Sequence, residues 1–353
     1  MGITTKRTAL LIGILALLVF GALQVLAADV PRHDFPRVGA YEVLSGDFHM
    51  HTLNSDGRLT TRARVEETQS FGYDVMAITD HGSMRSYRVA KCVGEQLGVI
   101  VLPGFETGVK DKEHYVVIGA SPSFVPRDAH RLAETKGADT KFYQDEMRDI
   151  AAAGGFMFHP HPHVGYREPT DWGIKNNMIS GIEVQNGCGL KDEGWGMAAF
   201  GDVWCYPHGF DWGLQHNLTL LANTDVHGPR SKVTQPVTLV LATERTPAAV
   251  MDALRARRTV AWFNGMLWGR EEMLKPLLAA SVVVKQVNGQ EVEVENRCPV
   301  ALKGTVFGTT IELAPYAKTR LEYPGVDSVS VKWENIWTSP KTNLVSDVKI
   351  ARN

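Results

Sequence analysis

Two short segments of the chain carry residues of the kinds that hold metal ions. The segment 47–51 reads DFHMH, so His49 and His51 lie two positions apart, and Asp225 and His227 repeat that spacing. Side chains two apart on an extended segment point to the same side, so each pair can grip one ion. Imidazoles together with carboxylates suit zinc, iron or manganese, whereas oxygen ligands alone suit calcium or magnesium.

Other candidate ligands follow further apolar runs along the chain. They are Asp56, His81, Glu106, His114, His159 and His161. A single histidine in such a position would more often be an ordinary core residue than a ligand. So many candidates, nearly all at the ends of predicted strands, argue against that interpretation and predict a shared metal centre.

The elements that must position these residues are short buried strands. Apolar runs bounded by glycine and polar residues alternate with helical patterns, which predicts an α/β barrel of parallel strands. The predicted strands are 43–48, 74–79, 99–102, 115–119, 155–158, 181–184, 218–222 and 237–241. In a barrel the carboxyl ends of the strands meet on one face, so we expect the ligands to converge there.

The period of the apolar residues changes to two from about residue 280. Runs of this kind between turn residues predict a small antiparallel, sandwich-like β domain, joined near residues 268–270. Trp333 and Trp337 offer a platform for stacking on a sugar, but packing in the core or between domains is the favoured use of such tryptophans.

The first residues are those of an export signal. Lys6 and Arg7 precede an apolar run, 9–25, and small residues follow, which predicts a signal peptide over residues 1–27 and a periplasmic or secreted protein. The run has seventeen residues, the short limit for crossing a bilayer, so a membrane tether through residues 9–25 is the alternative.

Composition sets further limits. The 353 residues suffice for one large and one small domain, and the net charge of -2 gives no basic field, so we expect no stable nucleic-acid partner. Export permits disulfides, and Cys188 and Cys205 either pair or stay free buried thiols. The four cysteines show no Cys-x-x-Cys spacing, which disfavours a thiolate zinc site.

Taken together, these motifs resemble the PHP (polymerase and histidinol phosphatase) superfamily over roughly residues 43–262. The matching segments are 47–52 (DFHMHT), 55–60 (SDGRLT), 79–81 (TDH), 104–106 (GFE) and 224–227 (TDVH). The resemblance implies a distorted (β/α)7 TIM-like barrel with two or three divalent ions, zinc, manganese or iron. We therefore predict a metallohydrolase domain over 28–270 and a β domain over 271–353.

The resemblance also implies how the ligands divide among the ions. The first ion would be held by His49, His51, Glu106 and Asp225. Glu106 would bridge to a second ion, completed by His114 and His159. A third ion would be held by Asp56, His81 and His227. Asp80 and Glu183 are expected to accept hydrogen bonds from ligand imidazoles and so orient them.

The reaction implied is hydrolysis of a small phosphoester. A water shared by two ions would attack phosphorus, and no Gly-x-Ser-x-Gly nucleophile elbow occurs in the chain. The residues expected to take part in catalysis are Asp225, His161, Arg167 and Arg230. His161 is a candidate ligand, substrate contact or general acid, and the arginines, with Arg58, are candidates to bind phosphate oxygens.

Two alternatives remain. The same metal cluster can serve a carbonyl hydrolase acting on an amide, a lactone or a sugar-linked ester, because fold does not fix substrate. An apolar pocket would favour that reaction, and converging arginines would favour phosphate. The other alternative is an envelope binding protein with structural metals, although structural sites need fewer ligands. The oligomeric state is left open.

Overall fold

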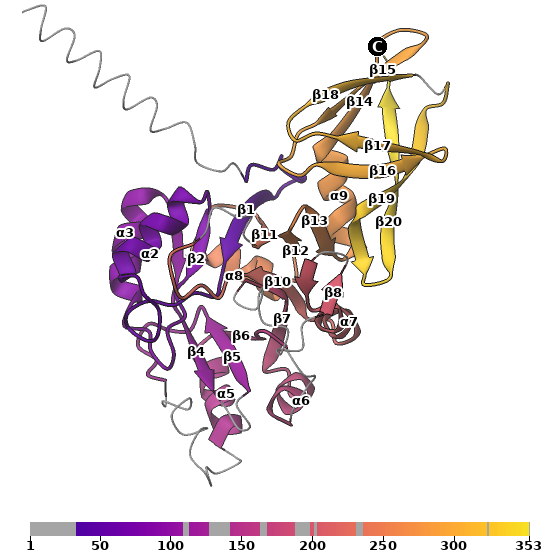
Figure 1. Ribbon diagram of the computed structural model, residues 1–353. Coiled ribbons are helices and arrows are strands. Elements are labelled where there is room, and N and C mark those ends of the chain that lie inside the picture. The colour runs from indigo at the N-terminus through magenta and orange to yellow at the C-terminus, as the bar shows by residue number, and fades with distance from the viewer. Residues whose placement is uncertain are drawn as a thin grey trace, which may run out of the picture.

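The computed structural model describes residues 33–108, 113–126, 142–162, 168–187, 198–200, 203–230, 236–322 and 325–352. Two sheets with helices on their outer faces form a mixed α/β fold (Figure 1). The larger sheet includes three parallel strands, β1 (Glu42–Asp47), β2 (Val75–Ala77) and β3 (Ile100–Leu102). The parallel arrangement brings the carboxyl ends of these strands to one edge, where candidate ligands follow them.

Beside β1 the larger sheet turns antiparallel. It continues through β11 (Val237–Ala242), β12 (Thr259–Phe263) and β13 (Met266–Gly269). Asn264 and Gly265 join the last two strands with φ angles of 47° and 71°. This is the left-handed geometry of a tight hairpin, for which Asn-Gly is the preferred dipeptide.

The smaller sheet has five strands. Their order is β10 (Thr219–Asn223), β7 (Ile179–Asn186), β6 (Phe156–His159), β5 (His114–Ile118) and β4 (Gly104–Gly108). The first three are parallel, and β5 runs antiparallel to both of its neighbours. Single bridges between Met50 and Val226 and between His81 and Glu106 join segments of the two sheets at the strand ends.

The described helices are α2 (Thr61–Ser70), α3 (Tyr87–Leu97), α5 (Phe142–Ala152), α6 (Glu168–Lys175), α7 (Pro207–Gln215), α8 (Pro247–Arg255) and α9 (Glu271–Ser281). Two of these helices have ordinary capping residues at one end. The Thr246 side chain accepts a hydrogen bond from the Ala249 amide at the start of α8, and Gly98 ends α3 with a φ of 75°. A short hairpin, β8 (Ala198–Phe200) and β9 (Val203–Cys205), precedes α7.

The last seven strands continue the larger sheet. They are β14 (Val282–Gln286), β15 (Glu291–Asn296), β16 (Leu302–Val306), β17 (Thr309–Leu313), β18 (Lys318–Glu322), β19 (Ser328–Ser339) and β20 (Thr342–Ala351). Parallel pairing of β13 with β19 makes the sheet continuous across the predicted join. Trp333 is buried and its Nε1 donates to Ser346 Oγ at 2.8 Å, which agrees with packing and not with an exposed sugar platform.

The mixed α/β class is confirmed, but a closed parallel barrel is not, because the sheets are open and contain antiparallel pairs. Tight connections such as that between β12 and β13 permit only antiparallel pairing, since parallel strands need a long crossover. Three predictions concern residues outside the described ranges and stay predictions: the signal segment, the phosphate contact of Arg167 and the pairing of Cys188. Within the described ranges, no helix has the length and apolar character needed to cross a membrane.

Candidate metal centre

The candidate ligands come from loops at the carboxyl ends of the strands. His49 and His51 follow β1, and both are fully buried. The segment after β10 carries Asp225, whose amide donates to the His49 carbonyl oxygen at 2.8 Å. This contact brings two motifs separated by about half of the chain into one place, as the sequence predicted.

One group of ligand atoms surrounds two carboxylate oxygens. Nε2 of His49 lies 3.2 Å from both Glu106 Oε2 and Asp225 Oδ1, and Nε2 of His51 lies 3.3 Å and 3.1 Å from the same two oxygens. Two imidazole nitrogens and two carboxylate oxygens at these separations fit a four-coordinate divalent ion. The predicted first ligand set is therefore assembled in full.

A second group forms around the other oxygen of Glu106. Oε1 lies 2.9 Å from His114 Nδ1 and 3.1 Å from His161 Nε2. Because Glu106 presents one oxygen to each group, it has the geometry of a bridging ligand, as predicted. The second histidine of this group is His161 and not His159.

His159 is the member of the predicted set that the structure places elsewhere. Its Nδ1 lies 3.0 Å from Thr170 Oγ1 at the start of α6, and Thr170 in turn donates to Glu113. Residues two apart on an extended strand would face the same side, but the backbone at His161 turns sharply, with a φ of 27°. That turn aims His161 into the cluster and leaves His159 out of every described ligand group.

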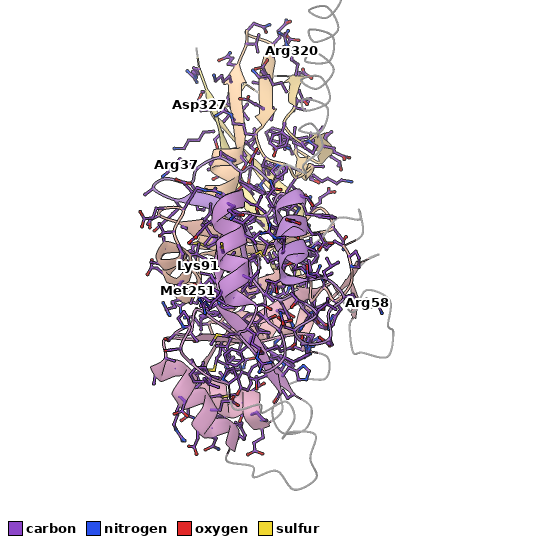
Figure 2. The ribbon with its side chains drawn as sticks, turned by 90° about the vertical axis from the view of Figure 1, so that its left-hand side faces the viewer. Arg37, Arg58, Lys91, Met251, Arg320 and Asp327 are labelled. Carbon is purple, nitrogen blue, oxygen red and sulfur yellow. The ribbon has the colours of Figure 1, made fainter. Side chains whose placement is uncertain are left out.

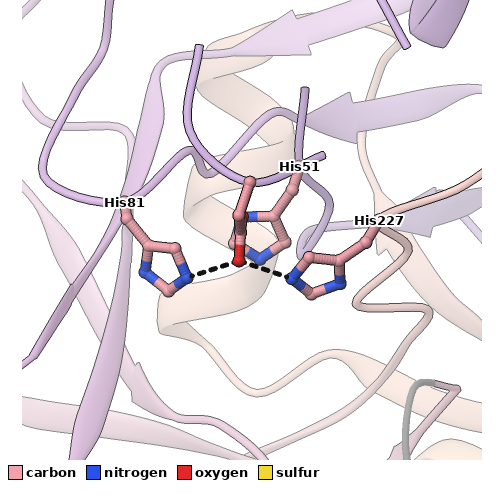
Figure 3. Close-up of side chains that lie close together, drawn as sticks. His51, His81 and His227 are labelled. Atoms are coloured by element: carbon pink, nitrogen blue, oxygen red, sulfur yellow. Dashed lines mark hydrogen bonds and ion pairs between the residues drawn. The ribbon is translucent and has the colours of Figure 1, made fainter. Parts of the chain in front are cut away.

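A third group surrounds Asp56. Its Oδ2 lies 3.1 Å from His227 Nε2 and 3.4 Å from His81 Nε2, and its Oδ1 lies 3.4 Å from His51 Nδ1. Figure 3 shows the three imidazoles around this carboxylate. The predicted third set is thus brought together, and His51 lies between it and the first set.

Glu183 supports the ligands from behind. Its Oε1 lies 3.0 Å from His49 Nδ1 and accepts from Asn223 Nδ2 at 2.9 Å, while its Oε2 accepts from the His161 amide at 2.7 Å. This geometry agrees with the predicted role of Glu183 in orienting an imidazole, since a ligand histidine needs an acceptor for its second nitrogen.

Asp80 acts differently from the prediction. Its carboxylate accepts hydrogen bonds from Thr52, Ser55 and Ser86, so it fixes the loop after His51 and not an imidazole. The reason is that the hydroxyl groups of Thr52, Ser55 and Ser86 lie within hydrogen-bonding distance of the Asp80 carboxylate.

Arg230 is a third correction. Its side chain is fully buried, donates to Asp47 at 2.7 Å and lies over the ring of Tyr73 at 4.6 Å from the ring centroid. A guanidinium enclosed in this way is not directed at a substrate. Of the other predicted arginines, Arg58 is exposed at the edge of the molecule (Figure 2), and Arg167 lies outside the described residues.

Arg64 is a functional residue that the sequence did not reveal. It lies on α2 with its side chain fully buried and donates to the backbone carbonyl oxygens of His51, Val226, His227 and Gly228. These bonds tie together the loops after β1 and β10. The sequence shows only an arginine on a largely polar helix. The burial that reveals its role appears only in the fold.

Electrostatics match a cation-binding role. Burial by itself would lower the pKa of His49, but the carboxylates of Asp225, Glu106 and Glu183 outweigh it and raise this pKa well above its usual value. Burial would raise the pKa of Glu106, but the His49 and His114 imidazoles hold it well below its usual range. Carboxylates kept charged in a buried site fit divalent cations, and metal ions would replace protons on the imidazoles.

The backbone is strained at two of the ligands. Asp225 has a φ of 49° and His161 a φ of 27°, values that residues with a side chain seldom adopt. Such strain is retained where the surrounding structure enforces it, often at functional sites. Here it directs both side chains to the cluster.

Comparisons with known proteins agree with this fold. A solved two-domain protein of Bacteroides vulgatus, described as containing a predicted PHP-like metal-dependent phosphoesterase, aligns with a TM-score of 0.73 and 24% identity over 90% of this chain and 98% of its own. No family model matches the sequence. The predicted resemblance to PHP-like proteins is thus confirmed by the fold.

Two curated proteins match shorter parts of the sequence. The DNA polymerase III PolC-type of Clostridium perfringens is 26% identical over 44% of this chain, and the phosphoribosyl 1,2-cyclic phosphate 1,2-diphosphodiesterase of Eggerthella lenta is 34% identical over 19% of it. The matches span 12% and 26% of those proteins, so each covers only a part of the relative.

Proposed function

We propose that this protein, whose fold is that of the PHP-like metal-dependent phosphoesterases, hydrolyses small phosphoesters with two or three bound divalent ions. One observation carries the proposal. Glu106 presents one carboxylate oxygen to each of two groups of imidazoles, which is the arrangement of a bridged metal pair. The phosphodiesterase named among the relatives supports a phosphoester substrate.

The residues have distinct tasks in this reaction. His49, His51 and Asp225 would hold one ion of the pair, and His114 and His161 would hold the other. Bound divalent ions would supply an activated water and neutralise charge on the phosphoryl oxygens. Glu183 fixes the ring of His49, so that its Nε2 stays aimed at the cluster before substrate arrives.

The second group can also serve the leaving oxygen. His161 and His114 are only partly buried, whereas His49 and His51 are fully buried. A substrate would therefore approach from the side of the second and third groups, where an ion held by His114 and His161 would contact its oxygens. No arginine is needed for this step, because the third group around Asp56 would add another cation.

Location and domain division are part of the proposal. The apolar run 9–25 after Lys6 and Arg7 supports export and a substrate outside the cytoplasm. The change of apolar period from about residue 280 supports a PHP domain over 28–270 and a β domain over 271–353. Cell fractionation of a tagged chain tests the first point, and limited proteolysis followed by mass spectrometry tests the second.

The decisive experiment combines metal analysis with phosphoester assays. Purified protein is loaded with manganese, zinc or iron, and its metal content and its turnover of bis-p-nitrophenyl phosphate and p-nitrophenyl phosphate are measured. We expect two or three ions per chain, turnover of at least one ester, and loss of both properties in His49→Ala. The matched control is His216→Ala, because His216 is exposed at the end of α7.

Each other outcome has a definite meaning. Bound metal without phosphoester turnover under any metal would refute the phosphoesterase and favour hydrolysis of an amide or a lactone, to be assayed next on p-nitroacetanilide and a γ-lactone. Absence of bound metal in the folded protein would refute the metal centre itself.

A further inference from the structure

The third ligand group, made of Asp56, His81 and His227, is the most exposed part of the metal centre. The side chain of Asp56 is 51% exposed, whereas those of Glu106 and Asp225, the other two candidate carboxylate ligands, are 2% and 8% exposed. Figure 3 shows the rings of His81 and His227 on either side of the Asp56 carboxylate. Asp56 is therefore the carboxylate ligand that a substrate arriving from solvent meets first.

The loop that carries Asp56 is held in place by its backbone. A side chain at Gly57 would bring its Cβ within 2.5 Å of the His51 carbonyl carbon, so the loop packs directly on the first ligand segment. The amide of Arg58 donates to the His227 carbonyl oxygen at 2.6 Å. These contacts hold the backbone of Asp56 beside His227, and the charge of Asp56 thus has a fixed place at the metal centre.

The third group adjoins the second one through His81. Nε2 of His81 lies 3.4 Å from Asp56 Oδ2, and its Nδ1 lies 3.4 Å from Glu106 Oε2. The centroid of the His81 ring is 5.5 Å from that of His114, which belongs to the second group. Charges a few ångströms apart near a protein surface interact appreciably, because the effective dielectric constant there is well below that of water. A phosphoryl group that reaches His114 is thus affected by the charge at Asp56.

The charge at Asp56 depends on whether the third group holds an ion. An aspartate is ionised above about pH 5, so the empty group presents one negative charge to the substrate. A divalent ion adds two positive charges, and the local sum becomes positive. A phosphomonoester carries close to two negative charges near pH 8, since its second pKa is about 6, and a diester carries one. The monoester therefore gains more from a filled third group than the diester does.

Two buried arginines lie behind the ligand loops and cannot supply this positive charge. Arg64 donates to Glu67 and to backbone carbonyl oxygens, and Arg230 donates to Asp47 at 2.7 Å. Both guanidinium groups are fully buried. The additional charge of a monoester needs a cation elsewhere, and an ion beside Asp56 is placed to provide it.

We propose that Asp56 sets the charge class of the substrate. With an ion held at the third group the centre favours dianionic phosphomonoesters, and with that group empty it favours monoanionic phosphodiesters. The inference rests on the proposed function and adds a substrate class to it. Because the third group is exposed and the first is buried, scarcity of divalent ions would empty the third group first. The preferred substrate class would then follow the supply of metal.

The test measures the binding of two small probes, inorganic phosphate and dimethyl phosphate. Isothermal titration calorimetry gives both affinities at pH 8 for the full chain loaded with saturating or limiting manganese, and elemental analysis gives the number of ions per chain. We expect the ratio of the phosphate affinity to the dimethyl phosphate affinity to fall by at least about tenfold when the third ion is missing. An unchanged ratio would overturn the proposal.

Three variants assign the effect to Asp56. Asp56→Ala removes the ligand, so it should bind one ion fewer and show the lowered ratio. Asp56→Lys also loses the ion but supplies a fixed positive charge, so it should restore the preference for phosphate. Asp252→Lys makes the same change at an exposed position on α8 and should keep the wild-type ratio. Retention of every ion in Asp56→Ala, or equal ratios in Asp56→Ala and Asp56→Lys, would contradict the role of Asp56.

The remaining outcomes separate this inference from the proposed function. Arg58→Met tests the rival cation: a lowered ratio with all ions retained would assign the charge to Arg58 and refute the inference. Should the Asp56 variants fail to fold by circular dichroism, the wild-type chain at limiting manganese decides by the same ratio. Turnover of phosphoesters with an unchanged ratio would refute the charge selection alone. Absence of probe binding and of turnover in every form would refute the phosphoesterase itself.

Discussion

Nε of Arg64 donates to the backbone carbonyl oxygen of His51 at 3.1 Å. The same guanidinium donates through Nη2 to carbonyl oxygens of the 226–228 segment at 3.0–3.3 Å. One buried side chain thus fixes the relative position of two ligand-bearing loops, and Glu67 balances its charge. Burial acts to lower the pKa of Arg64, and Glu67 opposes this. The third ligand group depends on both loops.

Replacing Arg64 should therefore weaken that group first. We expect Arg64→Met to lower metal affinity at the group around Asp56 by about ten- to a hundredfold, the usual effect of losing a supporting contact, with the ion beside His49 retained. Metal titration followed by calorimetry measures both sites. Arg62→Met, an exposed change on the same helix, is the control, and equal loss of all ions in Arg64→Met would contradict the selective role.

Glu183→Gln tests the support of His49. The variant keeps the side-chain shape but removes the charged acceptor for His49 Nδ1, so metal affinity at the first group should fall by about ten- to a hundredfold. Competition with a chromogenic chelator reports the affinity. Glu66→Gln, at an exposed position, should leave it unchanged, and an unaltered affinity in Glu183→Gln would show that the contact has no such role.

Variants of His161 and His159 can be compared directly, because the structure places His161 in the second group where the sequence predicted His159. His161→Ala removes a nitrogen that lies 3.1 Å from Glu106, so we expect loss of one ion per chain and a fall in turnover of at least about a hundredfold. His159→Gln should keep the full metal content. Elemental analysis of both variants decides, and the reverse pattern would restore His159 as the ligand.

Metal removal should destabilise the fold. Without ions, the charges of the buried Glu106 and Asp225 carboxylates are opposed by imidazoles, and Asp225 also accepts a hydrogen bond from Asn186 at 3.2 Å. A ligand that binds only the folded state stabilises by about 2.7 kcal/mol at a hundred times its Kd. Dialysis against a chelator should lower Tm, and adding manganese or zinc should restore it. An identical Tm with and without metal would argue against tight sites.

His33 predicts a pH dependence away from the metal centre. Its ring packs edge-on against Tyr73 and Trp262, and burial, with Arg230 nearby, lowers its pKa to about 4. The unfolded chain takes up this proton near pH 6.5, so stability is lost as the pH falls from about 6.5 to about 4. The loss is at most about 3 kcal/mol. His33→Phe should remove this part of the pH dependence of urea unfolding, and His216→Phe should not.

The sequence by itself determined the chemistry of the site. Residue types and spacings at 47–51, 79–82, 104–106 and 224–227 predicted an imidazole and carboxylate cluster, because strand ends converge whatever the details of their pairing. The caps of α3 and α8 are likewise set by single residues, Gly98 and Thr246, since capping depends on local backbone geometry. Local sequence patterns therefore predicted most of the candidate ligands and the α/β class.

Tertiary structure decided what depends on distant neighbours. The left-handed turn at His161 selects it over His159, and the ion pair with Asp47 holds the Arg230 side chain in the buried interior. Open sheets replaced the predicted barrel because some of the predicted strands pair antiparallel, as β1 does with β11 and β5 does with both of its neighbours. In each case the role of a side chain depends on its distance from residues far away in the sequence. Those distances are set by the tertiary structure and cannot be obtained from local sequence patterns.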